Sequence, residues 1–194
     1  MKMNDNNCTN GVVPVPQQVT SEHLLIRPST RSDAPFLKKW WNDPTVTEPG
    51  GTAAGMQYDD SDMEEWFQRY VDGRQCATHF VICLRDAKET PIGEFYIASD
   101  DRPGSVDVAL LIGEIRLWGR GYGTEALEAY AGMLFASGTC EAIRLNTRRD
   151  NAAAIRMSTN VGFEVEHIWA NGQFQTMILT QPAFEYRLMK AQAG

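Results

Sequence analysis

The sequence has few cysteines and histidines, and they do not fall in the pattern of a metal site. Its four cysteines, Cys8, Cys76, Cys83 and Cys140, are scattered along the chain, and only three histidines accompany them. Zinc ligands and disulfide frameworks both need clustered or regularly spaced side chains. We therefore expect neither a structural disulfide nor a bound metal.

Long apolar runs are also missing. No run approaches the roughly 18 to 20 apolar residues that a membrane-spanning helix needs, and residues 1–7 lack the apolar centre of a signal peptide. We therefore expect a cytoplasmic protein without a membrane partner.

Basic side chains are fewer than acidic ones. Eighteen lysines and arginines stand against 25 aspartates and glutamates, a formal charge of −7. This balance opposes binding to a polyanion, so nucleic acid is not an expected partner. It suits cationic partners such as aminoglycosides, polyamines or basic protein tails, although many proteins are acidic only for solubility.

The chain of 194 residues, 43% of them hydrophobic, is long enough for one domain with a substantial core. Residues 1–20 are rich in Asn, Pro, Gln and Thr without apolar periodicity, and are predicted to be a flexible arm. A single domain is then expected over residues 21–194.

Apolar spacing and turn residues predict the elements of this domain. A helix should carry Trp40 and Trp41 and end near Pro44, a loop should cover 48–60, and a capping box at Ser61–Glu64 should start a helix that ends at Gly73. Strands are expected at 24–28, 79–84, 92–98, 105–112, 142–147, 163–169 and 174–180, with helices between Gly121 and Gly138 and over 151–161.

A glycine-rich segment, Trp118-Gly119-Arg120-Gly121-Tyr122-Gly123-Thr124, lies between a predicted strand and a predicted helix. Glycines there let backbone N–H groups converge, and a helix N-terminus adds partial positive charge, so a phosphate fits. Glycines in such turns can also serve packing alone. The segment has no lysine of a P-loop and comes too late in the chain for a dinucleotide fold.

This segment, continued by Glu125-Ala126-Leu127, resembles the acetyl-CoA pyrophosphate loop of GNAT acetyltransferases, in the form typical of the branch that acetylates ribosomal-protein N-termini. Asn151-Ala152-Ala153-Ala154-Ile155-Arg156, followed by Val161-Gly162-Phe163, resembles the second signature of the family. The resemblance implies an α/β (α+β) fold, with a mixed, mostly antiparallel, splayed sheet flanked by about four helices. It also makes a homodimer an expectation.

The resemblance assigns acetyl-CoA as cosubstrate to particular residues. Backbone groups of Leu111, Ile112 and Gly113 would pair with the pantetheine arm, and the N–H of Ile112 could stabilise the oxyanion. Residues Trp118, Gly119, Arg120, Gly121, Tyr122, Gly123 and Thr124 would hold the pyrophosphate. Asn151 would hydrogen-bond the arm from the opposite side, or would act only as a helix N-cap.

Transfer to an amine requires removal of a proton, because a lysine-like amine is only about one part in 10³ neutral at pH 7. Asp107, Glu94 and Glu114 are the candidate bases. Asp107 ranks first because the strand 106–114 resembles a stretch of the family in which an acidic residue occupies the same place, and Glu94 could share the work through water. Each could instead be an ordinary polar residue on a half-exposed sheet.

Ser158 stands where many members of the family have a tyrosine that protonates the leaving thiolate. Solvent or a serine-bound water would then supply that proton. Trp41 and Glu114 are expected to line the acceptor pocket, and the loop 48–60 to help select the substrate.

Three interpretations follow. The first is an N-acetyltransferase that acts on a small cationic amine such as an aminoglycoside or polyamine. The second is an acetyltransferase of protein N-termini, and the third is a non-catalytic acetyl-CoA-binding module.

Overall fold

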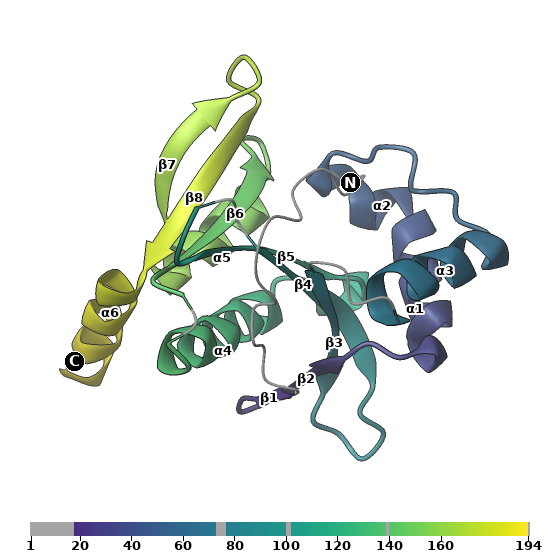
Figure 1. The fold of residues 1–194 in the computed structure, drawn as a ribbon, viewed down its shortest axis with the longest axis horizontal. Helices are drawn as coiled ribbons and strands as arrows, with labels where there is room; N and C mark the ends of the chain where they lie inside the picture. Colours follow the sequence, from purple (N-terminus) through teal and green to yellow (C-terminus); the bar gives the residue numbers. More distant parts are fainter. Residues whose placement is uncertain (1–17, 73–76, 100–101, 139, 194) are drawn as a thin grey trace.

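The computed structural model describes residues 18–72, 77–99, 102–138 and 140–193, which form one eight-stranded sheet with helices on both faces (Figure 1). The strand order is β1-β2-β3-β4-β5-β6-β8-β7. The strands are β1 Val19–Thr20, β2 Leu24–Pro28, β3 Ala77–Leu84, β4 Pro91–Ser99, β5 Ser105–Ile112, β6 Ala142–Arg148, β7 Glu164–Trp169 and β8 Phe174–Thr180. Among these strands β5 and β6 are the parallel pair and the other neighbours are antiparallel, which confirms the predicted mixed α/β sheet.

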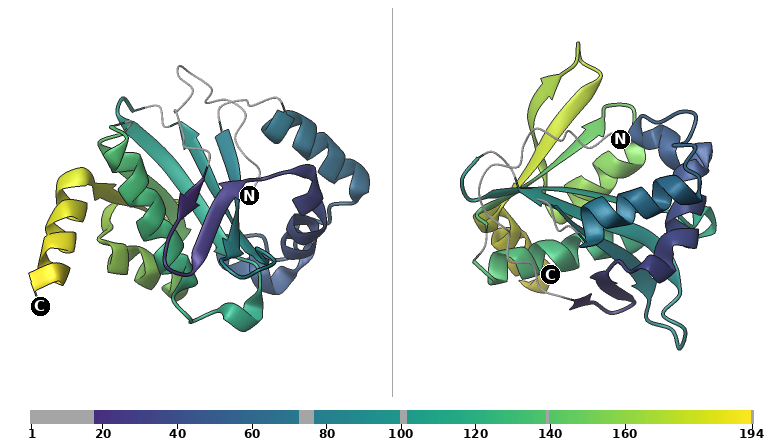
Figure 2. Two further views of the ribbon diagram at one scale, coloured as in Figure 1. Left: turned by 90° about the horizontal axis from the view of Figure 1, so that it is seen from below. Right: turned by 45° about the vertical axis from the view of Figure 1, so that its right-hand side comes forward.

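Two groups of helices cover the two faces of the sheet (Figure 2). The α-helices are α1 Ala34–Asn42, α2 Pro44–Thr47, α3 Asp60–Phe67, α4 Tyr122–Ala136, α5 Ala152–Val161 and α6 Gln181–Ala193. On one face α4 buries Tyr130 against Phe80 and Phe95. On the other, α1 and α3 bury Trp40 and Phe67 against β3 in a separate cluster. None of the helices within the described ranges is long and apolar enough to span a bilayer.

The domain begins slightly earlier than predicted. Most of the expected arm, residues 1–17, lies outside the described residues. Its last two residues form β1, where Val19 pairs with Ile26 and is 8% exposed. The apolar side chain of Val19 thus extends the sheet by one short edge strand.

The start of α3 also differs from the prediction. Its N-cap is Asp59, whose carboxylate accepts the N–H groups of Ser61 and Asp62, while Asp62 accepts the N–H of Asp59. The run Asp59–Glu64 offers two frames for a capping box, and the structure uses Asp59–Asp62, which begins two residues before the predicted one. The α-helix ends at Phe67 and continues as a π-helical turn, Gln68–Asp72; the predicted end at Gly73 lies outside the described residues.

Helical structure occupies two regions that the sequence pattern did not resolve. The expected loop over 48–60 opens with a 3₁₀ turn, Glu48–Gly50, directly after α2. The C-terminal helix α6 has no clear apolar periodicity, although Phe184 packs against Phe135 of α4.

The sheet splits between β5 and β6. Their pairing runs from Ser105–Ala142 to Asp107–Arg144 and then stops within the described strands. Gly113 donates its N–H to Ile92 across the other edge of β5. Because backbone groups alternate between the two edges of a strand, the N–H and C=O groups of Val108, Leu110 and Ile112 point into the opening.

Candidate functional site

The glycine-rich segment forms an open turn into α4. Gly121 is the N-cap with a φ of 89°, and Gly119 has a φ of 73°, a left-handed conformation that favours glycine. A Cβ added at either position would meet no atom within 4 Å. The first N–H groups of α4 lack intrahelical partners, and Gly121 supplies no side-chain cap, so an anion can approach them.

Glu125, in the first turn of α4, is held by a neighbouring segment. Its carboxylate accepts hydrogen bonds from the hydroxyl of Ser21 at 2.6 Å and the N–H of His23 at 2.7 Å. Burial raises the pKa of Glu125, but these hydrogen bonds outweigh it and bring the pKa below its ordinary value. The negative charge is therefore engaged with the β1–β2 turn.

Trp118 connects the glycine-rich turn to the end of β5. Its indole nitrogen donates to the carbonyl oxygen of Ile112 at 2.6 Å. At Gly123 an added Cβ would lie 3.0 Å from the sulfur of Met157, so α4 and α5 approach closely there. The structure thus brings the predicted pyrophosphate loop and the predicted pantetheine strand together at the opening of the sheet.

Glu114 fastens the end of β5 to α1. One carboxylate oxygen accepts hydrogen bonds from Lys39 at 2.6 Å and from the indole of Trp40 at 3.1 Å, and Arg116 lies 3.7 Å from the other. Burial raises the pKa of Glu114, and the bonds to Lys39 and Trp40 lower it by more. An added Cβ at Gly113 would overlap the Trp40 ring, at 2.1 Å. These contacts give Glu114 a structural function. They do not indicate that Glu114 binds a substrate or removes a proton.

Glu94 and Trp41, both predicted site residues, are in direct contact. The indole nitrogen of Trp41 donates to Oε2 of Glu94 at 2.9 Å, and Nε2 of His79 lies 2.9 Å from the same oxygen. Oε1 accepts no hydrogen bond from the described part of the chain. One carboxylate oxygen is therefore fixed and the other is left for a ligand.

An aromatic cluster adjoins this carboxylate through Trp41. Trp41 contacts Trp66 at a centroid distance of 4.8 Å and Tyr58 at 5.8 Å, and Trp66 contacts Tyr70 at 5.6 Å. Trp41 and Trp66 are almost fully buried, whereas the two tyrosines are partly exposed. Trp41 is thus part of a larger aromatic cluster.

Asp107 lies at the closed end of the opening, on the same sheet face as Glu94. Asp107 pairs in register with Ala98, and Glu94 pairs with Leu111. Because Leu111 is four residues beyond Asp107 on β5, Asp107 and Glu94 lie about 13 Å apart along the strands. Tyr96 lies between them on this face. Burial, followed by the nearby charges of Tyr70 and Asp107, raises the pKa of Tyr96 to about 12, so its hydroxyl stays protonated.

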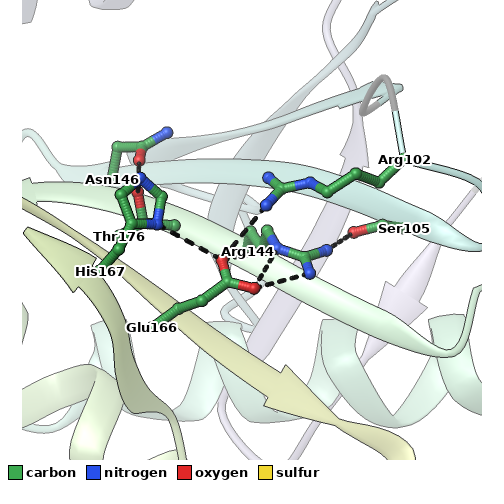
Figure 3. A network of polar contacts seen from close by, with 7 residues as sticks. All are labelled: Arg102, Ser105, Arg144, Asn146, Glu166, His167 and Thr176. Carbon is green, nitrogen blue, oxygen red and sulfur yellow. Dashed lines mark hydrogen bonds and ion pairs between the residues drawn. The ribbon is translucent and has the colours of Figure 1, made fainter.

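A polar network holds β5, β6 and β7 together (Figure 3), and one of its residues, Arg144, pairs in register with Asp107. Arg144 of β6 donates to Glu166 of β7 at 2.8 to 3.1 Å and also to the hydroxyl of Ser105. Hydrogen bonds from Arg144 lower the pKa of Glu166, and Arg102 adds a contact at 3.3 Å. This network fixes the strands where the opening begins. No sequence pattern predicts this network, because Arg102 and Ser105, Arg144, and Glu166 come from three separate segments.

Asn151 and Ser158 use their polar atoms within the protein. Asn151 accepts the N–H of Ala154 at 3.1 Å as the N-cap of α5, and its amide donates to the carbonyl of Pro49 at 3.0 Å. Ser158 is 0% exposed and donates to the carbonyl of Ala154 at 2.9 Å. The N-cap interpretation of Asn151 is supported. Protein atoms cover Ser158 completely, and its hydroxyl is engaged within α5.

The described cysteines and acidic residues suggest neither a nucleophilic thiol nor a metal centre. Burial raises the pKa of Cys83 and of Cys140 to about 11, which keeps both thiols protonated at neutral pH. Within the described ranges, His, Cys, Asp and Glu side chains do not gather in groups of three suited to a metal ion. Cys8 and Cys76 lie outside the described residues.

Residues 23–164 match the family described as Acetyltransferase (GNAT) domain. No curated protein shows a significant sequence match. The solved structure of aminoglycoside acetyltransferase AAC(6')-Ib with ribostamycin and coenzyme A is 25% identical, with a TM-score of 0.71, over 84% of this chain and 97% of that one. Spermidine N-acetyltransferase from Vibrio cholerae, with CoA and spermine, is 18% identical, with a TM-score of 0.69 over 85% and 99%. An uncharacterized protein from Bacillus halodurans is 19% identical, with a TM-score of 0.75 over 91% and 95%.

Proposed function

Because the chain belongs to the GNAT acetyltransferase family, we propose that it transfers an acetyl group from acetyl-CoA to a small molecule that carries at least two amino groups. Aminoglycosides and polyamines are the classes with this chemistry. The similar structures with bound ribostamycin or spermine support the choice of these classes.

The opening of the sheet suits acetyl-CoA. The free N–H groups at the start of α4 would bind the pyrophosphate, next to glycines that leave the approach open. The inward-facing N–H and C=O groups of Leu110 and the N–H of Ile112 would pair with the pantetheine arm. An N–H group of this edge would also donate to the oxyanion that forms when an amine attacks the thioester.

The observation that carries the substrate class is the free oxygen of Glu94 beside an aromatic cluster. A carboxylate attracts an ammonium group, and the faces of tryptophan and tyrosine add cation–π attraction. Two hydrogen bonds hold the other oxygen, so the acceptor atom is already oriented. Glu94 is therefore proposed to bind a substrate ammonium group that does not react.

Asp107 is proposed as the base for the reacting amine. It lies on the same sheet face, at the end of the opening opposite to the loop. Asp107 would take one proton from the attacking nitrogen as the new C–N bond forms. The C–S bond breaks, and the thiolate, with a thiol pKa near 8.5, takes its proton from solvent.

The test is thiol release from acetyl-CoA, followed with Ellman's reagent, across aminoglycosides, polyamines, monoamines, amino acids and N-terminal peptides. Asp107→Asn should lower kcat by about 10² or more, the usual contribution of a general base. Glu94→Gln should raise the KM of diamines about tenfold and abolish their advantage over monoamines, because a hydrogen bond to a charged group is lost. Glu65→Gln, the same change at an exposed position of α3, is the control.

The alternatives give different outcomes in the same assay. Turnover confined to peptides would support an acetyltransferase of protein N-termini. Thermal stabilisation by acetyl-CoA without thiol release from any amine would support a non-catalytic binding module. Either result would refute the proposed substrate class.

A further inference from the structure

His79, in the middle of β3, is a buried polar residue that the proposed reaction does not use directly. Its side chain is 3% exposed. The indoles of Trp41 and Trp66 meet its ring edge to face, at centroid distances of 6.0 and 4.7 Å. A leucine would satisfy such a packing site, so the imidazole is present for its hydrogen bonds.

Both ring nitrogens of His79 have partners. Nε2 lies 2.9 Å from Oε2 of Glu94, and Nδ1 lies 2.6 Å from the hydroxyl of Ser29, which is 4% exposed. An ionised carboxylate can only accept, so Nε2 carries the hydrogen, and in the neutral ring Nδ1 accepts from Ser29. The backbone N–H of Ser29 also donates to the carbonyl of His79, at 3.0 Å. The carboxylate of Glu94 thereby selects the Nε2–H tautomer, and Ser29 holds the ring in place through Nδ1.

We propose that His79 is a positioning residue for amine recognition, and that it acts by holding Oε2 of Glu94 so that Oε1 faces the acceptor pocket. The inference rests on the proposed function of Glu94. A glutamate has three rotatable bonds, and ordering it in the complex would weaken binding. The Ser29–His79 pair and Trp41 supply this order before the amine arrives.

Two substitutions test the two ring nitrogens of His79 one at a time. His79→Gln keeps a donor near the position of Nε2, and His79→Asn keeps a partner for Ser29 near the position of Nδ1. Both remove the aromatic ring and introduce an amide, so each is a control for the other. A purely structural function predicts equal effects, with losses that follow the melting temperature.

His79→Asn should raise the KM of a diamine or polyamine about tenfold, since a hydrogen bond to a charged group is lost. Its kcat and its KM for acetyl-CoA should stay within about twofold of wild type, and His79→Gln should keep the diamine KM within about threefold. In Glu94→Gln, the further change His79→Asn should add little, because the two residues act on one interaction. Equal KM values for the Asn and Gln variants, or additive effects in the double variant, would overturn the inference.

A readout that does not need turnover keeps this inference separate from the proposed function. Nitrogen-15 NMR of the His79 ring should show the Nε2–H tautomer in the wild type and a changed ring signal in Glu94→Gln. An unchanged signal would refute the coupling even if diamines are acetylated. Absence of thiol release with every amine would refute the proposed function, while the NMR result would still decide whether His79 holds Glu94.

Discussion

The indole nitrogen of Trp118 donates a hydrogen bond to the carbonyl oxygen of Ile112 over 2.6 Å and so joins the glycine-rich turn to the strand that precedes it. Trp118 and Ile112 are both predicted to contact acetyl-CoA, and this hydrogen bond fixes the position of one relative to the other. The carbonyl of Ile112 is occupied, and its N–H still points into the opening of the sheet.

Trp118→Phe should weaken the binding of coenzyme A about three- to tenfold, the usual effect of one lost hydrogen bond. The kcat at saturating acetyl-CoA should change little, because the loop binds but does not react. Isothermal titration calorimetry measures the affinity. Trp169→Phe, on β7 and similarly exposed, is the matched control and should bind as the wild type does; equal affinities of Trp118→Phe and the wild type would contradict the prediction.

Ser158→Ala should leave kcat within about twofold of wild type, because the hydroxyl is bonded to its own helix and reaches no ligand. Steady-state kinetics at saturating concentrations of both substrates give this value. A tenfold fall in kcat without a change in melting temperature would mean that Ser158 takes part in proton transfer after all.

Gly113→Ala should destabilise the fold by about 1 to 3 kcal/mol or more, because the added methyl group meets the fully buried ring of Trp40. Urea unfolding measures the difference. Gly132→Ala in α4 is the control: its Cβ would lie 3.6 Å from Phe184, an ordinary contact, and alanine in a helix should stabilise by about 0.5 to 1 kcal/mol. Equal stabilities of the two variants would show that Trp40 moves aside.

Asp33 should make the stability of the protein depend on pH in the acid range. Burial raises the pKa of Asp33, but hydrogen bonds from Arg27, both at 2.8 Å, and from the N–H of Thr30 outweigh it and lower the pKa. A lowered pKa gives a stabilisation that is complete above the unfolded value, about pH 4, and is lost as the pH falls through the folded value.

The stability advantage of the wild type over Asp33→Asn should therefore be constant between about pH 7 and 5 and should shrink toward pH 3. Urea unfolding at these three pH values provides the comparison. Asp60→Asn, at an almost fully exposed partner of Lys38, should show no such change. A stability advantage of the wild type that grows toward pH 3 would contradict the prediction.

Local sequence patterns predicted the elements that build the acetyl-CoA side. The glycines from Gly119 to Gly123 and the cap at Asn151 act through backbone conformation within a few residues, so the sequence shows them directly. The prediction for Trp41 and Glu94 named both residues but not their contact. That contact joins α1 to β4 over 53 positions, and sheet register decides it.

Contacts between distant segments could not be predicted from local patterns. The carboxylate of Glu114 accepts hydrogen bonds from Lys39 and Trp40, which lie on a helix 75 and 74 positions away. His79 and Arg144 received no function because a single histidine or arginine in a strand carries no local pattern. Their importance depends on partners that only the folded sheet brings within reach.

The residues proposed to bind the amine and those proposed to bind acetyl-CoA come largely from separate segments of the chain. Trp41, His79 and Glu94, which form the amine side, all precede β5, whereas the acetyl-CoA loop follows it. The segments that would bind the acyl donor and the second amine are therefore separate in the sequence. Exchanging the segment before β5 with that of a relative is a direct way to graft a new amine preference onto an unchanged donor site.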